Sequence, residues 1–180
     1  MITTYMPSMY WAGPRCFSSS LRWYDLRVIR HLEKMGWKVY YPLLLVKEEI
    51  DKNPGAKLLG RYGLIRTTCL GYIEKADIIV AYVGLFWDTG TAHELEYAVQ
   101  LGKPILMWSD SSVYMVETLG RNLETSNPNE MFCKALPLNA MSVVCDRFVE
   151  VSELYNEGIS PEELAKLIDR NAREILKNKK

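Results

Sequence analysis

A carboxylate near the start of a helix is the part of this chain best suited to chemistry. Glu94 lies in residues 87–98, which follow a short apolar run at residues 76–83. The apolar run is typical of a buried strand, and the segment after it has helical spacing and ends at residues 102–104. The helix dipole favours an ionised carboxylate in the first turn by about 0.3–1 kcal/mol. Such a carboxylate at the mouth of a sheet suits attack on an electrophilic carbon, as in glycosyl transfer.

The same carboxylate also has a purely structural interpretation. Acidic residues are common in first turns because they stabilise the turn, so position alone leaves the role of Glu94 open. Asp88, or the threonine after it, can cap the helix, and Gly90 lets the backbone approach a ligand closely. Glu96 and His93 project from other faces of the helix than Glu94. We therefore predict that His93 is a surface or packing residue.

Aromatic residues mark a second candidate position, a turn that contains Gly13. Tyr10, Trp11 and Phe17 bracket this turn. Rings beside the mouth of a sheet can stack on a planar nucleobase. The alternative is that Trp11 belongs to the core, that only one ring reaches a pocket and that the turn is an ordinary one.

Alternating strands and helices must position these residues. The pattern predicts strands at 9–12, 37–41, 78–83, 104–108 and 148–151, and helices at 18–35, 61–75, 91–101 and from 160 onward. The polar stretch 47–60 is predicted to be a surface loop. Such an alternation implies a parallel sheet covered on both faces, with ligands bound at the carboxyl ends of the strands. That edge gathers residues 10–14, residues 84–90 and the segment after residue 108.

Composition narrows the class of partner. The chain has 180 residues, with 22 basic and 22 acidic side chains and 48% hydrophobic residues. This length favours a single domain over residues 1–180 with a sizeable core. A formal net charge of zero gives no electrostatic footprint for long nucleic acid or an anionic membrane.

The spacing of the cysteines and histidines argues against a zinc site. The four cysteines contain no Cys-x-x-Cys pair, and the two histidines are isolated in the sequence. We therefore expect no zinc site, no cofactor and a reduced cytoplasmic setting. No apolar run approaches the roughly 20 residues of a membrane span, and no signal peptide is apparent at the N-terminus.

Four segments resemble motifs of the nucleoside 2-deoxyribosyltransferases. Residues 10–14 (YWAGP) resemble the opening YxAGP motif, and residues 88–95 (DTGTAHEL) resemble the D-x-G-T-A-x-E signature. Residues 76–81 resemble the strand before that signature, and residues 136–141 (LPLNAM) resemble the later LPxNxM segment. The matches follow the family order, and their combination is more specific than any one of them.

The resemblance implies a flavodoxin-like (Rossmann-like) α/β fold, a three-layer sandwich around a central parallel five-stranded sheet. It also implies a double displacement without a cofactor. Glu94 would attack C1′ of a 2′-deoxynucleoside, expel the base and hold a covalent 2-deoxyribosyl ester. A free nucleobase would then take the sugar, and two inversions give net retention.

The resemblance also assigns roles to other residues. Tyr10 matches the tyrosine that positions the nucleophile, and Asp88 matches the carboxylate that hydrogen-bonds the sugar. Asn139 and Met141 match sugar-end contacts from a neighbouring subunit, which implies a homo-oligomer with shared active sites. The neutral amide of Asn139 suits a free 5′-hydroxyl, whereas related nucleotide N-glycosidases tend to have a phosphate-binding residue there. The remaining positions expected to bind substrate are Gly13, Phe17, Cys69 and Gly90.

Cys69 departs from the family pattern. It stands where the family usually has an Asp, eight positions before Asp77, and the family Asp contacts the base and helps to protonate the leaving nitrogen. A thiol is a weaker acid and a weak hydrogen-bond donor. Another group then protonates the base, or the base preference has changed, or activity is low. The alternative is that Cys69 is simply a small buried apolar residue.

Two other functions are compatible with the sequence. The chain can be an N-glycosidase that hydrolyses a nucleoside 5′-monophosphate or a modified nucleoside. It can also be a nucleoside-sensing module that kept the pocket and lost its acid, and Cys69 motivates this second alternative.

Overall fold

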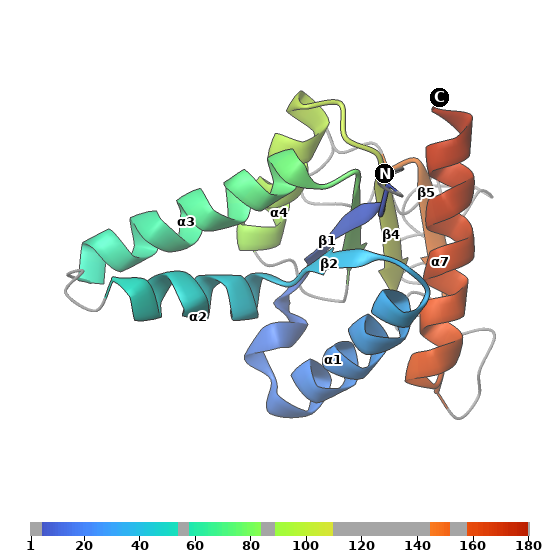
Figure 1. Ribbon diagram of the computed structural model, residues 1–180, viewed down its shortest axis with the longest axis horizontal. Coiled ribbons are helices and arrows are strands. Elements are labelled where there is room, and N and C mark those ends of the chain that lie inside the picture. Colours follow the sequence, from blue (N-terminus) through green and yellow to red (C-terminus); the bar gives the residue numbers. More distant parts are fainter. Residues whose placement is uncertain (1–4, 54–57, 84–88, 110–144, 152–157, 180) are drawn as a thin grey trace, which may run out of the picture.

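A five-stranded parallel sheet forms the centre of the molecule (Figure 1). The structure, a computed structural model, describes residues 5–53, 58–83, 89–109, 145–151 and 158–179. The strand order is β2-β1-β3-β4-β5, and every pairing is parallel. The strands are β1 (Ser8–Ala12), β2 (Lys38–Tyr40), β3 (Ile78–Tyr82), β4 (Ile105–Ser109) and β5 (Arg147–Glu150). The predicted parallel five-stranded sheet is confirmed.

Helices cover both faces of this sheet. Helices α1 and α7 pack against each other on one face, and α2, α3 and α4 lie on the other, which gives three layers (Figure 1). The helical elements are η1 (Pro14–Phe17), α1 (Ser19–Lys34), α2 (Pro42–Lys52), α3 (Leu58–Lys75), α4 (Thr89–Gln100) and α7 (Pro161–Asn178). Among the helices described, none has the length and apolar character that a membrane span requires.

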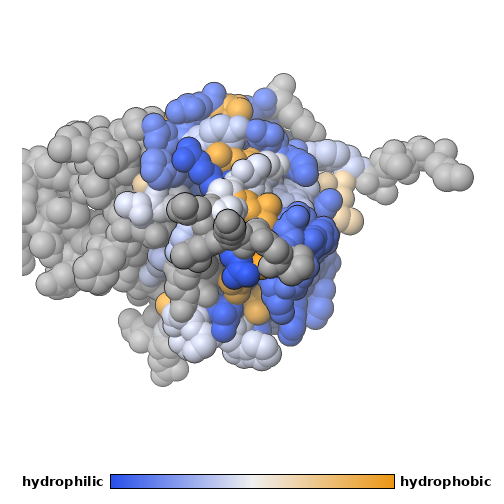
Figure 2. All heavy atoms as spheres, turned by 90° about the vertical axis from the view of Figure 1, so that its left-hand side faces the viewer, coloured by the Kyte–Doolittle hydropathy of each residue, from blue (hydrophilic) through white to orange (hydrophobic). Residues whose placement is uncertain are grey.

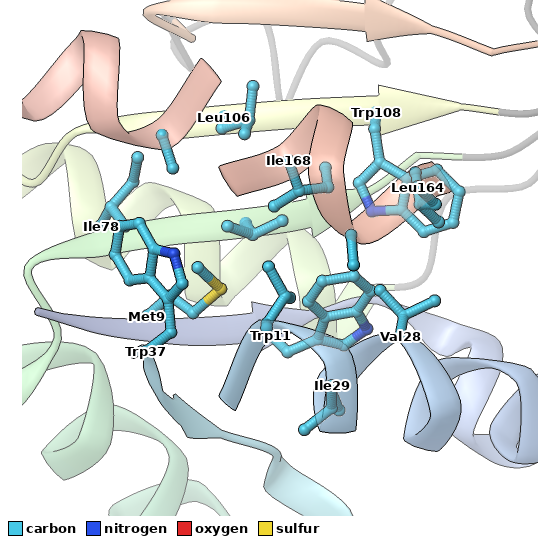
Figure 3. Close-up of a cluster of buried hydrophobic side chains, with 14 of the residues drawn as sticks. Met9, Trp11, Val28, Ile29, Trp37, Ile78, Leu106, Trp108, Leu164 and Ile168 are labelled. Carbon is cyan, nitrogen blue, oxygen red and sulfur yellow. The ribbon is translucent and has the colours of Figure 1, made fainter. Parts of the chain in front are cut away.

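Strand β1 sends its side chains alternately into two separate cores. Met9 and Trp11 point toward α1 and α7 and share one core with Val28 of α1 and Leu164 of α7 (Figure 3). Tyr10 and its alternate neighbours belong to the second core, under α3 and α4. Both faces of the strand are buried, which explains why its sequence is apolar throughout. Trp11 is therefore a core residue, and Tyr10 is the ring that the sheet directs toward α3 and α4.

The predicted surface loop at residues 47–60 is wrong at residues 47–52 and 58–60, which are helical. Helix α2 begins at Pro42, immediately after β2, and continues to Lys52. Proline fits the first position of a helix, so Pro42 starts this helix as well as ending the strand. The polar residues are its solvent-facing part, where Lys52 pairs with Glu48 at 3.0 Å and with Glu49 at 2.9 Å. Helix α3 begins at Leu58 and packs against α2.

The start of α7 agrees with its sequence signals. Ser160 accepts a hydrogen bond from the backbone N–H of Glu163, and the Glu163 carboxylate accepts one from the backbone N–H of Ser160. This reciprocal capping box satisfies two backbone donors that a helix start otherwise leaves unpaired. It fixes the helix that covers the α1 side of the sheet.

Candidate active site

Tyr10 and Glu94 meet across the space between the sheet and α4. The Tyr10 hydroxyl donates a hydrogen bond of 2.6 Å to Oε1 of Glu94. Tyr10 is fully buried, at 0% exposure, so its ring is fixed by the core while its hydroxyl reaches the helix. Charge-assisted hydrogen bonds of this length are strong, and this one fixes the orientation of the carboxylate.

Glu94 lies deeper in its helix than the sequence predicts. Helix α4 begins at Thr89 rather than two residues later, so Glu94 is in its second turn and no acidic residue is in the first. The dipole effect fades beyond the first turn. The direct bond from Tyr10 is therefore the better-defined influence on this carboxylate.

The surroundings of Tyr10 keep its hydroxyl protonated. Burial raises the pKa of Tyr10 well above its ordinary value, and the nearby Glu94 and Cys69 raise it further. A raised tyrosine pKa favours the neutral form, which is the form that can donate the hydrogen bond. The neutral Tyr10 hydroxyl therefore contributes fully to the stability of the folded protein below the ordinary tyrosine pKa of about 10. This contribution is lost as pH rises through the higher pKa of Tyr10 in the folded state.

Cys69 completes this group from the side of α3. Its side chain is 8% exposed, forms no disulfide bond and contributes to the raised pKa of Tyr10. Strand β1, α3 and α4 therefore each contribute one side chain to a single cluster of Tyr10, Cys69 and Glu94. Cys69 belongs to the apolar core as well, so both interpretations of this residue describe part of its surroundings.

A pocket of about 520 Å³ lies between α3 and α4, and Glu94, Cys69 and Gly90 are on its wall. Tyr10 stands behind this wall. The other lining residues come from the same two helices: Tyr62, Ile65, Arg66, Leu70, His93, Glu96, Tyr97 and Gln100. Figure 2 looks toward the tips of α2 and α3 and shows hydrophobic patches among hydrophilic residues on this end of the molecule. A mixed lining of this kind suits a small ligand that has both apolar and polar parts.

Several lining residues were not singled out in the sequence. Tyr62, Arg66 and Tyr97 have only the helical spacing of α3 and α4 in common, and that spacing does not distinguish a pocket wall from a solvated face. His93 is a surface residue as predicted, with its Nδ1 3.8 Å from Glu96 Oε2, but it also borders the pocket.

Other predicted site residues are placed differently or are not described. Asp88, Asn139 and Met141 lie outside the described residues, as does the side chain of Phe17. Gly13 directly follows β1, its backbone lies close to Tyr82, and its predicted contact with substrate stays a prediction. In the described ranges, no group of three potential metal-ligating side chains comes together.

The sequence that carries this site matches a known protein family. A family model described as nucleoside 2-deoxyribosyltransferase matches residues 9–141, which is more than half of the chain. The chain belongs to the nucleoside 2-deoxyribosyltransferase family. The matched region begins in β1 with the segment that carries Tyr10 and includes both Cys69 and Glu94.

Three solved structures are similar to this deoxyribosyltransferase family member. The 2-deoxyribosyltransferase from Bacillus psychrosaccharolyticus is 26% identical over 58% of this chain and 73% of that chain, with a TM-score of 0.48. The CMP N-glycosidase BcmB from Clostridium botulinum is 15% identical over 91% and 98%, with a TM-score of 0.50. The 2-deoxyribosyltransferase from Leishmania mexicana is 21% identical over 91% and 97%, with a TM-score of 0.47. No curated protein sequence matches the chain significantly, so membership of the deoxyribosyltransferase family rests on the family model.

The turn after β1 requires a glycine at position 13, and a substitution there tests this requirement. Gly13 has φ 136° and ψ 159°, a conformation almost restricted to glycine. A Cβ atom there would lie 3.0 Å from Cβ of Tyr82 and 3.2 Å from its carbonyl oxygen. We expect Gly13→Ala to lower the free energy of unfolding by about 2–4 kcal/mol, through backbone strain and overpacking.

Urea denaturation measures this effect, and Gly36→Ala is the matched control. Gly36 also has a positive φ, of 89°, but nothing lies within 4 Å of its added Cβ. The control should therefore show only the conformational cost, about 1–2 kcal/mol. Equal destabilisation by the two variants would show that the approach of Gly13 to Tyr82 does not restrict this position.

Proposed function

We propose that this chain transfers the 2-deoxyribosyl group between nucleobases through a covalent ester on Glu94. The observation that carries the proposal is the hydrogen bond from Tyr10 to Glu94 at the wall of a pocket large enough for a nucleoside. Membership of the deoxyribosyltransferase family gives the reaction class, and the cluster of Tyr10, Cys69 and Glu94 gives the residues.

The first step forms the ester. A carboxylate oxygen of Glu94 bonds to C1′ of the deoxynucleoside while the C1′–N bond breaks and its electron pair leaves with the base, which takes up a proton. Tyr10 holds the carboxylate by one oxygen, Oε1, and so orients the nucleophile before the substrate arrives. A donor that is already in place requires no reorganisation during the reaction.

The second step returns the enzyme to its starting state. A nitrogen of the acceptor base bonds to C1′, the ester bond breaks, and the carboxylate of Glu94 is released as the acceptor loses a proton. Each step inverts C1′, so the product retains the configuration of the substrate. Water in place of the acceptor base gives hydrolysis as a side reaction.

The transfer assay tests the proposal against its rivals. Deoxyinosine and free adenine are incubated with the protein, and the products are separated by chromatography. New deoxyadenosine supports transfer, whereas free hypoxanthine and deoxyribose alone support an N-glycosidase. Binding of deoxynucleosides with no product over long incubation supports the sensing module. The same assay with deoxynucleoside 5′-monophosphates in place of deoxyinosine tests whether the site prefers a free 5′-hydroxyl, the preference that we propose from Asn139.

Other parts of the proposal rest on the sequence and its family resemblance. We propose that Asp88 binds the sugar, that Gly13, Phe17 and Gly90 lie along the substrate, and that Asn139 and Met141 reach the site from a neighbouring subunit. The protein would then be a homo-oligomer of single-domain subunits with shared active sites. A cytoplasmic location also remains a proposal.

Removing the Tyr10 hydroxyl should slow transfer while leaving the fold intact. Tyr10→Phe keeps the buried ring and deletes only the donor to Glu94. A hydrogen bond to a charged group is worth about 1.5–3 kcal/mol, so we expect kcat to fall roughly 10- to 100-fold. The control is Tyr5→Phe, because the Tyr5 hydroxyl donates to Asp77 at the opposite end of the strands. Unchanged kcat for Tyr10→Phe would remove Tyr10 from the mechanism.

A further inference from the structure

A buried cation lies on the other face of the sheet from Glu94. Arg15 is in the η1 turn after β1 and is only 4% exposed. Its Nε donates to Oδ1 of Asp25 at 2.9 Å, and Asp25, from α1, is 1% exposed. The second carboxylate oxygen, Oδ2, accepts a hydrogen bond of 3.3 Å from Nε1 of Trp11.

Three aromatic rings surround the guanidinium group of Arg15. Its Cζ lies 4.7 Å from the ring centroid of Tyr82, 5.1 Å from that of Trp108 and 5.2 Å from that of Tyr24. Tyr82 ends β3, Trp108 is at the end of β4 and Tyr24 is on α1. Each distance is within the range of a cation–π interaction. The Arg15 side chain therefore connects the η1 turn to the carboxyl ends of two strands and to a helix.

Stability alone does not explain this arrangement. Burying two charges costs desolvation energy that their mutual attraction often only offsets, so apolar residues of similar volume would serve a core equally well. The planar guanidinium group adds geometry, because it fixes its hydrogen-bond partner and its stacking partners at once. A buried pair of this kind determines where the elements that it joins lie.

The contacts of Arg15 are connected to the Tyr10–Glu94 pair through strand β1. Trp11, which bonds to Asp25, is the neighbour of Tyr10, which bonds to Glu94, and the two side chains leave β1 on opposite faces. The end of β1 is therefore held from both sides of the sheet. A shift of this strand end would move the Tyr10 hydroxyl relative to Glu94.

We propose that Arg15 is a positioning residue for deoxyribosyl transfer, which fixes the end of β1 through Asp25 and Trp11 so that Tyr10 meets Glu94. This role rests on the proposed function. Arg15 lies on the opposite face of the sheet from Glu94, so its effect on the nucleophile passes through Asp25 and Trp11. Its loss should therefore reduce kcat more than it raises KM, since orientation of the nucleophile is used in the transition state.

The test compares Arg15→Met and Arg15→Lys in the transfer assay. We expect Arg15→Met to lower kcat by about tenfold or more, because small misplacement of reacting groups has large effects on rate. We expect KM to change less than about threefold. Arg15→Lys keeps the charge but not the planar fork, so it should recover part of the loss. If Arg15→Met does not fold, the comparison of Arg15→Lys with the wild type carries the test.

A similar arrangement elsewhere in the fold provides the control. Arg173 pairs with Asp169 at 2.6 Å, lies 5.1 Å from the ring centroid of Trp37, and Nε1 of Trp37 donates to Asp169 at 2.7 Å. This group is at the amino end of β2, away from Glu94. Arg173→Met should lower thermal stability and leave kcat unchanged. Wild-type kcat in folded Arg15→Met, or equal losses of kcat in both variants, would overturn the proposal.

An NMR measurement that does not depend on enzymatic activity tests the positioning role of Arg15 separately from the proposed function. The carbon-13 NMR signal of the Tyr10 ring carbon bonded to the hydroxyl, assigned with Tyr10→Phe, reports the hydrogen bond to Glu94. Arg15→Met and Arg15→Lys should shift this signal, and Arg173→Met should not. If the wild type fails to transfer deoxyribose, the proposed function is overturned while the NMR result still tests the positioning role. An unmoved Tyr10 signal in both Arg15 variants would contradict that role.

Discussion

Glu94→Gln is expected to abolish deoxyribosyl transfer. The substitution keeps the size and the acceptor oxygen that Tyr10 binds, but it removes the negative charge that attacks C1′. An amide is a poor nucleophile, and no ester can form on it in the proposed mechanism. We expect kcat/KM to fall by roughly 10³-fold or more, leaving only the rate that binding of the two substrates provides.

The matched control for this experiment is Glu96→Gln. Glu96 is on the same helix and also borders the pocket, but its carboxylate is half-exposed and lies near His93 rather than near Tyr10. Its transfer rate should stay within about threefold of the wild type. Intact-protein mass spectrometry after mixing with deoxyinosine alone should show the added deoxyribosyl group on the wild type and not on Glu94→Gln. Normal turnover by Glu94→Gln would exclude Glu94 as the nucleophile.

The fold could be predicted from the sequence because its buried strands are short and continuously apolar. The run Ile78–Tyr82 is buried on both faces in β3, and this is the pattern that a covered parallel sheet requires. The start of α7 was equally well defined, since serine, proline and acidic residues are all favoured at the start of a helix. These signals are local, so the sequence contains them in full.

Helix α2 shows where local signals are ambiguous. Its solvent-facing polar residues look the same in a sequence whether they belong to a loop or to an exposed helix. The apolar side chains that it packs against the two cores, Leu43, Leu45 and Val46, are only partly buried, and they all precede the polar residues of the predicted loop. Pro42 marks an end for the strand and a start for the helix, and only the three-dimensional structure shows that it does both.

The cluster at the site depends on contacts between distant parts of the chain. Glu94 was identified from its own segment, but its bond to Tyr10 joins residues 84 positions apart. Arg15 is a stronger example, because a basic residue in a turn is usually exposed to solvent. Its burial depends on Asp25 and on aromatic rings from β3 and β4, which the sequence does not place together.

Cys69→Asp is expected to raise the rate of transfer. The thiol interacts with the Tyr10 hydroxyl and lies on the pocket wall with Glu94, so an introduced carboxyl would be close to both. Burial and the like charge of Glu94 raise the pKa of such a carboxyl, which keeps it protonated near neutral pH. A protonated acid can donate to the leaving base, and general acid catalysis typically contributes about 10²–10⁴-fold. We expect an increase of at least about tenfold, because the new group enters a site that was not built around it.

Cys69→Asn separates acid catalysis from a change of shape. Its side chain matches that of aspartate in size but has no acidic proton to donate. The Asp variant should lose its advantage as pH rises through the pKa of the introduced carboxyl, since only the protonated form acts as the acid. The Asn variant should show no such decline. Equal rates for the two variants across this pH range, with both folded and both binding deoxyinosine, would mean that the leaving base takes its proton from elsewhere. Cys69 would then be a packing residue, and the departure from the family pattern would have no catalytic consequence.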